Sequence, residues 1–486
     1  MTPPFPRAPG DPPSRSIRVA ASFRDPSGYV FRRGQDIFRA LDEDSFGVLR
    51  RLVANGTFAQ LIQEQAIVRT QFVEDPELTE TLSSEHPGFQ QFLRHEPLDP
   101  ITYPYEWPIS MLADAAALTL DLQMRLLSSG CSLKDATPYN IQFMNGRPVF
   151  IDLSSFERPR RLDLWFALGQ FAQMFTFPIL LCRYAGWDLR SYFLANLGGL
   201  GIEEVARNFS LLRRLRPRLL LDLTLPLWLH RWVEKGQRAR REVLDKRRDN
   251  PRPQVLNLRR LRSKITKLAS SHKPSGVWSE YARVCNYDET AERAKQSLVA
   301  EFLKARRPKR VLDLGCNTGA YSRLAAENGA TVLAVDSDHD AVEVLYRRLR
   351  ENPAPISPMV VDLCNPSPAI GYMNRERPAF LDRVAADCVL ALALMHHLLV
   401  SGNLPLAAIR DMMLAMTRRD LVLEFIPPED DMFRRLLKFR VDLFDGLTLE
   451  RCREVFLGRF RLLKEEPVPH STRTLLFLTK NPPLGE

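Results

Sequence analysis

The chain has 486 residues, of which 45% are hydrophobic and 26% are charged, and its formal net charge is +10. This length suits two or three globular domains, each able to bury a core of its own. The seven cysteines are scattered, odd in number and contain no C-x-x-C pair, which argues against a disulfide framework or a zinc ribbon and favours a reducing, cytoplasmic compartment.

The first predicted segment is a Pro-rich lead over residues 1–20, which begins MTPPFPRAPGDPP. It lacks the apolar core of a secretory signal, so we expect a disordered lead. The most apolar long stretch comes later, at residues 165–182, and reads WFALGQFAQMFTFPILLC. It reaches the minimum length of a membrane span, but its two glutamines and late proline favour buried helices. We therefore expect no membrane span.

Residues 21–234 are predicted to form one α+β domain, and its most informative stretch is LKDATPYNIQFMNGRPVFIDLSSFE. Asp135 and Asn140 stand in the spacing D-x-x-x-x-N, and the strand-like RPVFID ends in Asp152, twelve residues after Asn140. This pattern resembles the catalytic loop, hairpin and metal-binding aspartate of protein kinases and aminoglycoside-type phosphotransferases. The resemblance implies that Asp135 orients an acceptor hydroxyl. It also implies that Asn140 and Asp152 hold magnesium, with Mg-ATP as donor, if the domain is active.

Two features predict that this kinase-like domain is degenerate or uses an unusual donor. The first lysine of the chain is Lys134, so no earlier lysine can hold the ATP phosphates from the third strand. Gly28 and Gly34 in SGYVFRRGQDIF do not make the glycine-rich loop G-x-G-x-x-G. Arg39 can supply a cation in place of the lysine, with a different reach. We expect the domain to bind the substrate or to hold the domain that follows.

Residues 235–275 are predicted to be a linker that concentrates the positive charge of the chain. Between Lys235 and Lys273 stand 14 Lys and Arg against 3 Asp and Glu, so this stretch carries +11 and the rest of the chain is close to neutral. Such a segment can hold an anionic partner such as RNA, DNA or lipid headgroups. A solvated helix and loop between domains is the favoured interpretation, because no aromatic side chains interleave with the charges.

Residues 276–486 are predicted to form a third part, in which VLDLGCNTGAYS marks the end of a first strand. An apolar run followed by glycines is typical of a buried parallel strand and of a turn where backbone approaches a ligand. The pattern D-x-G-x-x-x-G, from Asp313 through Gly315 to Gly319, resembles motif I of the class I S-adenosylmethionine-dependent methyltransferases. Asn317 stands where many of these enzymes have a third glycine, and it also weakens a dinucleotide fingerprint. The resemblance implies that these four residues bind S-adenosylmethionine.

Further apolar runs follow at the spacing of strand–helix–strand units. ATVLAVDSD ends in Asp336, 23 residues after Asp313, where a carboxylate can accept both ribose hydroxyls. MVVDLC ends in Asp362, and in the family an acid at this place meets the adenine amine. ADCVLALALMHHL and DLVLEFIPPEDD are the fourth and fifth strands, and RFRLLKEEPVPHSTRTLLFLTK is a terminal hairpin. The pattern predicts a doubly wound, Rossmann-like α/β fold with a seven-stranded methyltransferase sheet, preceded by the α+β kinase-like domain.

Candidate catalytic groups follow the fourth and fifth strands. Methyl transfer from a sulfonium is an in-line displacement, so the protein has to align donor and acceptor and remove a proton where the acceptor needs it. His396 and His397 leave the fourth strand, and an imidazole can act as general base near neutral pH. Glu424 ends the fifth strand and is a further candidate base. The alternative for the histidines is that one caps a helix or covers the adenosine while the other packs inside.

The C-terminal part also resembles bacterial class I methyltransferases of the nodulation-protein type, through LDLGCNTGAYS, ALALMHHL, LEFIPPEDD and STRTLLFLTK. The resemblance implies S-adenosylmethionine as donor and leaves the acceptor open. We predict a methyltransferase for a small-molecule or glycoconjugate acceptor, with the N-terminal domain presenting the substrate. One alternative is an RNA or protein methyltransferase that holds its substrate with the basic linker. Another is a non-catalytic scaffold, which the intact set Asp313, Asp336 and Asp362 disfavours.

Overall fold

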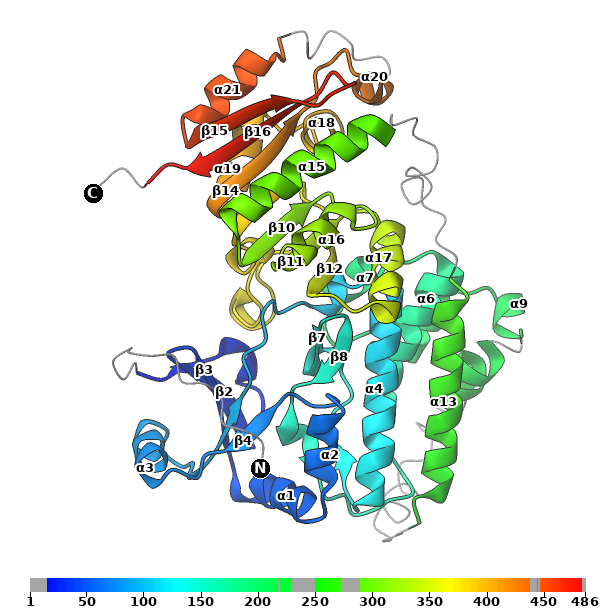
Figure 1. The fold of residues 1–486 in the computed structure, drawn as a ribbon. Helices are drawn as coiled ribbons and strands as arrows, with labels where there is room; N and C mark the ends of the chain where they lie inside the picture. The colour runs from blue at the N-terminus through cyan, green and yellow to red at the C-terminus, as the bar shows by residue number, and fades with distance from the viewer. Residues whose placement is uncertain are drawn as a thin grey trace. The chain divides into compact units, whose positions relative to one another are not determined.

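The chain folds into two compact units (Figure 1). The computed structural model describes residues 15–216, 219–228, 250–272, 289–437, 444 and 446–482. The N-terminal unit comprises Met1–Phe143, Arg147–Lys273 and Gly371–Arg377, and the C-terminal unit comprises Met144–Gly146, Pro274–Ile370 and Pro378–Glu486. The main boundary, between residues 273 and 274, lies at the C-terminal end of the predicted linker.

The N-terminal unit begins with a five-stranded antiparallel sheet in the order β1-β2-β3-β5-β4. Its strands are β1 (Ile17–Arg18), β2 (Gly28–Arg33), β3 (Asp36–Leu41), β4 (Thr70–Phe72) and β5 (Gln91–His95). The helices between them are η1 (Ala20–Ser22), α1 (Glu43–Ala54), α2 (Thr57–Gln63) and α3 (Pro76–Glu85). A two-residue turn joins β2 to β3, and Gly34 takes the positive φ of 62° that such turns require. Strand β1 lies inside the predicted lead, whose first 14 residues are outside the described ones.

The rest of the N-terminal unit is mainly helical and carries the strands of a second hairpin, whose tip, Met144–Gly146, is grouped with the C-terminal unit. Asn145 and Gly146, both with positive φ, make the turn of this hairpin, as the sequence Asn-Gly favours. The short strands are β6 (Ser132–Leu133), β7 (Ile141–Met144), β8 (Arg147–Phe150) and β9 (Phe156–Glu157). The helices are η2 (Pro104–Glu106), α4 (Ile109–Ser128), η3 (Pro138–Asn140), η4 (Leu153–Ser155), α5 (Leu168–Phe171), the π-helical η5 (Ala172–Thr176), α6 (Phe177–Ala185), α7 (Leu189–Ala195), α8 (Ile202–Arg207), α9 (Leu211–Arg214), η6 (Leu220–Thr224) and α13 (Arg252–Ser270).

Two expectations from the sequence can be compared with the structure in this helical part. The apolar stretch 165–182 is folded into α5, η5 and α6, most of whose side chains are buried or half-buried. Within the part of the chain that the structure describes, every helix is too short or too polar to cross a bilayer. The second half of the predicted linker is helix α13, which packs along α4 and α6 (Figure 1). Leu258 and Ile265 are buried there, and Arg262 forms an ion pair with Asp121 of α4.

The C-terminal unit is built on a seven-stranded sheet in the order β12-β11-β10-β13-β14-β16-β15. Strands β10 to β14 are parallel, and β15 and β16 form an antiparallel hairpin at the end of the sheet. The strands are β10 (Arg310–Leu314), β11 (Thr331–Asp336), β12 (Ile356–Val360), β13 (Ala386–Ala391), β14 (Thr417–Phe425), β15 (Phe460–Pro467) and β16 (Thr474–Lys480). This topology confirms the predicted doubly wound sheet with its terminal hairpin.

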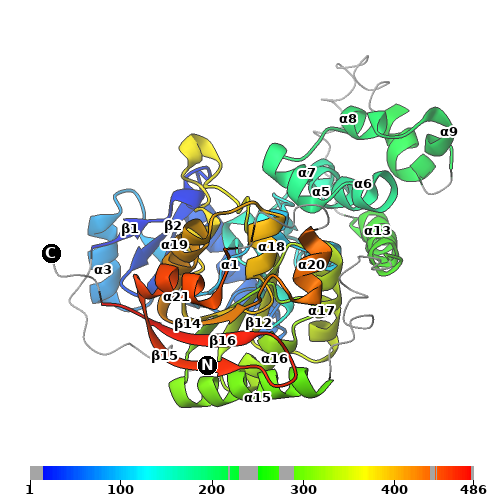
Figure 2. The ribbon, with the colours of Figure 1, turned by 90° about the horizontal axis from the view of Figure 1, so that it is seen from above.

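Helices cover both faces of this sheet (Figure 2). One face packs against α15 (Glu289–Arg306), α16 (Ala320–Glu327) and α17 (His339–Glu351). The other packs against α18 (Met395–Val400), α19 (Leu406–Met416), α20 (Asp431–Leu437) and α21 (Leu449–Leu457), with η8 (Phe380–Asp382) in the preceding loop. The short helix η7 (Tyr372–Asn374) belongs to the N-terminal unit. Successive side chains of a strand point to opposite faces, so Leu312 belongs to one core and Val311 to the other. The strands are therefore apolar on both faces, as their sequences predict.

Candidate functional site

The strand order reverses beside β10, which pairs with β11 on one side and with β13 on the other. In open α/β sheets such a reversal opens a crevice outside the carboxyl ends of the strands, where ligands bind. The predicted site residues of the C-terminal unit all lie at or just beyond these ends. The carboxyl ends of these strands are thus the edge of the sheet on which the structure places the predicted residues.

The turn after β10 has a backbone that is fixed in an unusual conformation. Gly315 and Gly319 have φ of 75° and 84°, and Asn317 has φ of 49°. At Gly319 a Cβ atom would also lie 2.5 Å from a methyl carbon of the buried Leu345. The amides of Gly315 and Cys316 both donate to the carbonyl of Val335 on β11, at 2.8 and 3.0 Å. The glycines are therefore required by geometry, and the turn is held against the neighbouring strand.

Asp336 connects this turn to the start of helix α17. Its Oδ2 accepts a hydrogen bond of 2.8 Å from the amide of Asn317, and its Oδ1 accepts one of 2.9 Å from the amide of Asp338. Burial raises the pKa of Asp336, and these backbone hydrogen bonds act against that rise. Asp362 follows β12 and is exposed, and its Oδ1 accepts from the amide of Cys364 at 2.9 Å. The two predicted ribose- and adenine-binding acids thus end neighbouring strands.

Asp313 plays a different part from the other two acids. It is buried within β10 and accepts a hydrogen bond of 2.5 Å from the hydroxyl of Ser322 on α16. Burial, with the nearby Asp336 carboxylate, raises the pKa of Asp313 to about 6, although the Ser322 hydroxyl lowers it. Asp313 therefore fixes α16 to the strand directly behind the turn.

One buried polar atom of the turn is left without a partner. The side-chain oxygen of Asn317 is buried and has no hydrogen-bond partner among the described residues. Buried polar atoms are paired in most native structures, so this atom is available to a donor on a ligand. The turn, Asp336 and the orphan amide oxygen fit a ligand that carries both amino and hydroxyl groups, as S-adenosylmethionine does.

Both predicted histidines lie on the short helix α18, directly after β13. His396 is buried, and its Nδ1 has no hydrogen-bond partner among the described residues. The ring centroids of His396 and His397 are 4.1 Å apart. Burial lowers the pKa of His396 well below its ordinary value, and His397 and Lys295 lower it further. Burial also lowers the pKa of His397, so both imidazoles are neutral near pH 7.

Glu424, the third predicted catalytic group, is engaged by two cations. Its side chain is 0% exposed, and its Oε2 accepts from Lys295 Nζ at 2.8 Å and from the amide of Ala393 at 2.7 Å. Its Oε1 lies 3.4 Å from Nη1 of Arg473, which also forms an ion pair with Asp430. Ala393 has φ of 49° in the turn between β13 and α18. Glu424 therefore holds this turn and the two cations at the end of the sheet.

Lys295 and Arg473 are site residues that the sequence analysis missed. Lys295 lies on α15 and is 3% exposed, between Ala291 and Val299, which are both in the core. A lysine in register with the apolar face of a helix is the signal that could have found it. The same helix is tied to α16, because the hydroxyl of Tyr321 donates to Glu292 at 2.7 Å. Together these contacts fix α15 over the carboxyl ends of the strands.

Comparison with known proteins identifies the family. A family model described as a methyltransferase domain matches residues 287–432. Nodulation protein NoeA of Rhizobium meliloti (strain 1021) is 34% identical over 473 residues, which cover 95% of this chain and 96% of NoeA. The chain belongs to the NoeA family. It is an S-adenosylmethionine-dependent methyltransferase.

The solved structures that match part of this chain include N-methyltransferase NodS from Bradyrhizobium japonicum WM9 in complex with S-adenosyl-L-homocysteine. It is 15% identical, with a TM-score of 0.30, and the match covers 39% of this NoeA-family chain and 87% of NodS. The bifunctional kinase-methyltransferase WbdD is 20% identical, with a TM-score of 0.29, and the match covers 44% of this chain and 46% of WbdD.

In the N-terminal unit of this NoeA-family protein, the predicted metal-binding residue Asp152 forms an ion pair with Arg39. Asp152 accepts a hydrogen bond of 2.7 Å from Nη1 of Arg39 on β3 and one of 2.6 Å from Ser154. Arg39 also donates to the carbonyl of Ile151 at 3.2 Å, and the backbone carbonyl of Asn140 accepts from the Ile151 amide. Among the described residues, the clustered groups that could hold a metal ion do not include Asp152. The guanidinium of Arg39 is thus paired with the carboxylate that was predicted to bind magnesium.

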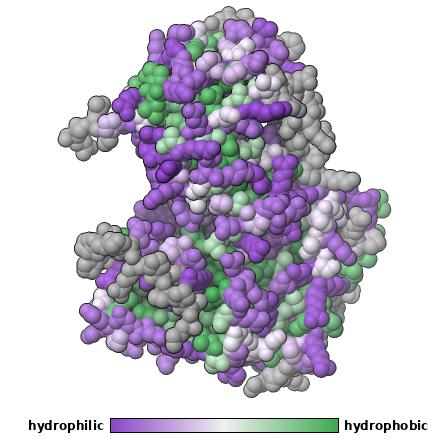
Figure 3. Space-filling view, viewed as in Figure 1, coloured by the Kyte–Doolittle hydropathy of each residue, from purple (hydrophilic) through white to green (hydrophobic). Residues whose placement is uncertain are grey.

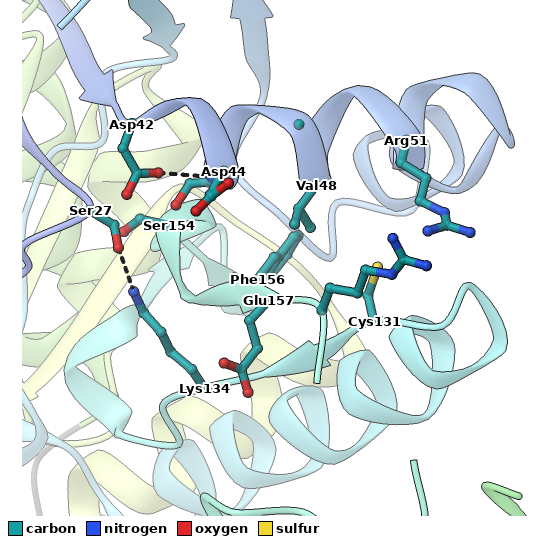
Figure 4. Close-up of a pocket in the computed structure, with 13 residues that line it drawn as sticks. Ser27, Asp42, Asp44, Val48, Arg51, Cys131, Lys134, Ser154, Phe156 and Glu157 are labelled. Carbon is teal, nitrogen blue, oxygen red and sulfur yellow. Dashed lines mark hydrogen bonds between the residues drawn. The ribbon is translucent and has the colours of Figure 1, made fainter. Parts of the chain in front are cut away.

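A pocket of about 470 Å³ lies next to these residues in the N-terminal unit (Figure 4). Lys134 extends into it and donates to Ser27 at 3.2 Å and to Asp25 at 3.3 Å. Burial and the Asp152 carboxylate raise the pKa of the adjacent Asp135. The lining combines hydroxyls, carboxylates and cations around a few apolar groups: Ser27, Asp42, Asp44, Ser45, Gly47, Val48, Arg51, Cys131, Lys134, Ser154, Phe156, Glu157 and Arg158. Such a lining suits a strongly polar ligand.

Proposed function

We propose that this methyltransferase acts on a small-molecule or glycoconjugate acceptor that is bound with the help of the N-terminal unit. The observation that carries the donor side of the proposal is the turn after β10, with its positive φ angles and the unpaired oxygen of Asn317. S-adenosylmethionine supplies a methyl group on a sulfonium. Gly315, Asn317 and Gly319 would receive its amino-acid part, because their backbone leaves room for close approach. Asp336 would accept the ribose hydroxyls and Asp362 the adenine amine.

On the acceptor side, His396 and His397 are the proposed proton acceptors. Their burial keeps them neutral near pH 7, so a lone pair is available on each imidazole. Glu424 is less suited to contact the acceptor, since its two carboxylate oxygens are already engaged by Lys295, Arg473 and the amide of Ala393. We assign Glu424 a positioning role, in which it fixes the turn that carries α18.

For the N-terminal unit we propose a kinase-like domain that binds a ligand without transferring phosphate. The order of its elements supports the kinase-like assignment: a five-stranded antiparallel sheet with helices after β3, then the long α4, the loop with Asp135 and the β7–β8 hairpin before Asp152. The ion pair between Arg39 and Asp152 supports the absence of magnesium chemistry. The adjoining polar pocket is the proposed ligand site.

The donor assignment is tested by isothermal titration of the full-length protein with S-adenosylmethionine. We expect micromolar binding, weakened at least tenfold in Asp336→Ala because the turn loses both its side-chain anchor and the ribose acceptor. Asp362→Ala should cost less, since this carboxylate is exposed. Asp411→Ala, which removes an exposed carboxylate on α19, is the matched control. Wild-type affinity in Asp336→Ala, with an unchanged melting temperature, would contradict the assignment.

The acceptor class is tested by the release of S-adenosyl-L-homocysteine. Oligosaccharides, small hydroxy and amino compounds, RNA and unrelated proteins are offered in parallel to the wild-type protein. We expect turnover with the first two classes only, reduced when the pocket is altered by Lys134→Ala. Turnover with RNA or protein alone would replace the proposal by the polymer-methylating alternative.

A further inference from the structure

The segment from α9 through η6 exposes large hydrophobic side chains to solvent. Leu211 and Leu212 are 75% and 81% exposed, and Trp228 is 62% exposed. Across the described ranges, 18 large hydrophobic side chains are exposed, and seven of them lie within residues 211–228. The seven are Leu211, Leu212, Leu215, Leu220, Leu221, Leu225 and Trp228, which we call the leucine patch. An exposed apolar concentration of this kind marks an interaction surface.

The leucine patch belongs to a folded part of the N-terminal unit. A second set of apolar side chains from the same segment is buried beneath it: Leu219, Leu223 and Leu227. The hydroxyl of Thr224 donates to the carbonyl of Arg214 at 2.7 Å, and Arg214 Nε donates to the carbonyl of Phe209 at 2.8 Å. These contacts fix α9 relative to η6, so the exposed leucines are held on the outside while others fill the interior. The segment is therefore apolar on both sides, which a purely solvent-facing segment would not be.

Positive charge surrounds the leucine patch. Within residues 205–228 the sequence has five arginines and one acidic residue, Asp222. Arg207, Arg213 and Arg216 are exposed, and no described acidic side chain forms an ion pair with them. Hydrophobic residues show in green at the right-hand edge of Figure 3, where Figure 1 places α9, with hydrophilic residues beside them. The surface therefore combines apolar side chains with exposed arginines that are not paired with any acidic side chain in the described ranges.

We propose that the leucine patch docks the protein on the surface of an anionic lipid bilayer. Leucine side chains and an indole ring suit the boundary between headgroups and acyl chains, and exposed arginines suit lipid phosphates. A second copy of the chain is a poorer occupant, because its own arginines would meet these arginines. A nucleic acid would satisfy the arginines but would leave the leucines exposed. The contact lies on the bilayer surface, in keeping with described helices that are all unable to span it.

The test measures sedimentation of the full-length protein with lipid vesicles. Vesicles contain phosphatidylglycerol and phosphatidylcholine in about equal amounts, or phosphatidylcholine alone. We expect binding to the anionic vesicles that weakens as salt is raised, and at least tenfold weaker binding to the neutral ones. Tryptophan emission should shift to the blue on binding to anionic vesicles, and part of this shift should disappear in Trp228→Phe.

Two variants separate the apolar and the charged contributions. Leu211→Ser/Leu212→Ser/Leu215→Ser should lower the affinity at least tenfold, and Arg213→Glu/Arg216→Glu should lower it and reduce its salt dependence. The matched control is Leu463→Ser, which alters an exposed leucine on β15 of the C-terminal unit and should bind as wild type. Unchanged affinity for S-adenosylmethionine and an unchanged circular dichroism spectrum verify that each variant is folded.

Three outcomes would overturn the proposal. The first is the absence of vesicle binding by the wild-type protein, and the second is equal binding by wild type and both patch variants. The third is a dimer, seen by analytical ultracentrifugation, that the leucine variant abolishes while vesicle binding is absent. That result would assign the leucine patch to a second copy of the chain.

Discussion

The buried ion pair between Lys295 and Glu424 gives the sharpest test of how the C-terminal unit is held together. The nitrogen and oxygen are 2.8 Å apart, and the two side chains are 4% and 0% exposed. Removing one partner of a buried pair leaves an uncompensated charge and costs about 3–5 kcal/mol. In Lys295→Met, Arg473 still lies 3.4 Å from Glu424, so we expect the lower end, about 3 kcal/mol.

In the companion variant Glu424→Gln, Lys295 loses its ion-pair partner at 2.8 Å, while the Glu292 carboxylate stays 4.0 Å away. It should cost a similar amount, since a buried lysine then loses the carboxylate to which it is hydrogen-bonded. The double variant Lys295→Met/Glu424→Gln removes both charges and should cost less than the sum of the single variants by about 2 kcal/mol. Arg451→Met, which breaks an exposed pair on α21, is the control and should change stability by less than about 1 kcal/mol.

The assay is urea unfolding of the full chain, with and without S-adenosylmethionine. A chain of two units need not unfold in a single transition, and the ligand stabilises the unit to which it binds. The ligand-sensitive transition therefore reports the C-terminal unit. If Lys295→Met lowered the free energy of that transition by less than about 0.5 kcal/mol, or if the double variant equalled the sum of the singles, the pair would not be the coupled element described here.

Three further predictions concern other parts of the two units. Gly319→Ala should destabilise the C-terminal unit by about 1–3 kcal/mol, because an alanine at φ of 84° is strained and its Cβ would meet Leu345. Urea unfolding measures this change, and an unchanged free energy of unfolding would contradict the prediction. The raised pKa of Asp313 makes the folded state bind its proton more tightly than the unfolded state does, so the free energy of unfolding should fall by about 2 kcal/mol between pH 4 and pH 6. Asp313→Asn should flatten that dependence, and an identical pH profile in the variant would refute the assignment. Arg39→Ala should destabilise the N-terminal unit by leaving Asp152 without its cation, and magnesium should then raise its melting temperature while having no such effect on the wild-type protein.

Much of the C-terminal site could be predicted because its signals are local in the sequence. Each strand is a short apolar run, and the residue that ends it is adjacent to the ligand crevice by the geometry of a parallel sheet. Gly315 and Gly319 predict a turn with positive φ, and the structure has that turn. Asp336 was predicted from its distance to Asp313, and it lies where it can join the turn to α17.

The contacts that were not predicted join residues far apart in the sequence. Lys295 and Glu424 are separated by 129 positions, and Arg39 and Asp152 by 113. No periodicity or motif specifies such a pairing, which depends on how helices and strands pack. Helix α13 is a related case. Its sequence is rich in basic residues, but apolar side chains lie along one of its faces, and this face packs on α4. Asp152 is a further case. The sequence places it after a hairpin, as the structure does, but its own segment does not indicate which residue pairs with it.

These long-range pairs determine the charges around His396, the proposed proton acceptor. Lys295 and Arg473 bring two positive charges close to the end of β14, and Glu424 and Asp430 neutralise them. A sulfonium donor would be repelled by a third cation, so burial that keeps His396 uncharged lowers the cost of binding the donor. In the function proposed above, the positive charge of the sulfonium would be lost when the methyl group leaves, and a proton accepted by His396 would restore it nearby. The total charge of the buried site would then be the same before and after transfer, which is the condition under which a low-dielectric site opposes the reaction least.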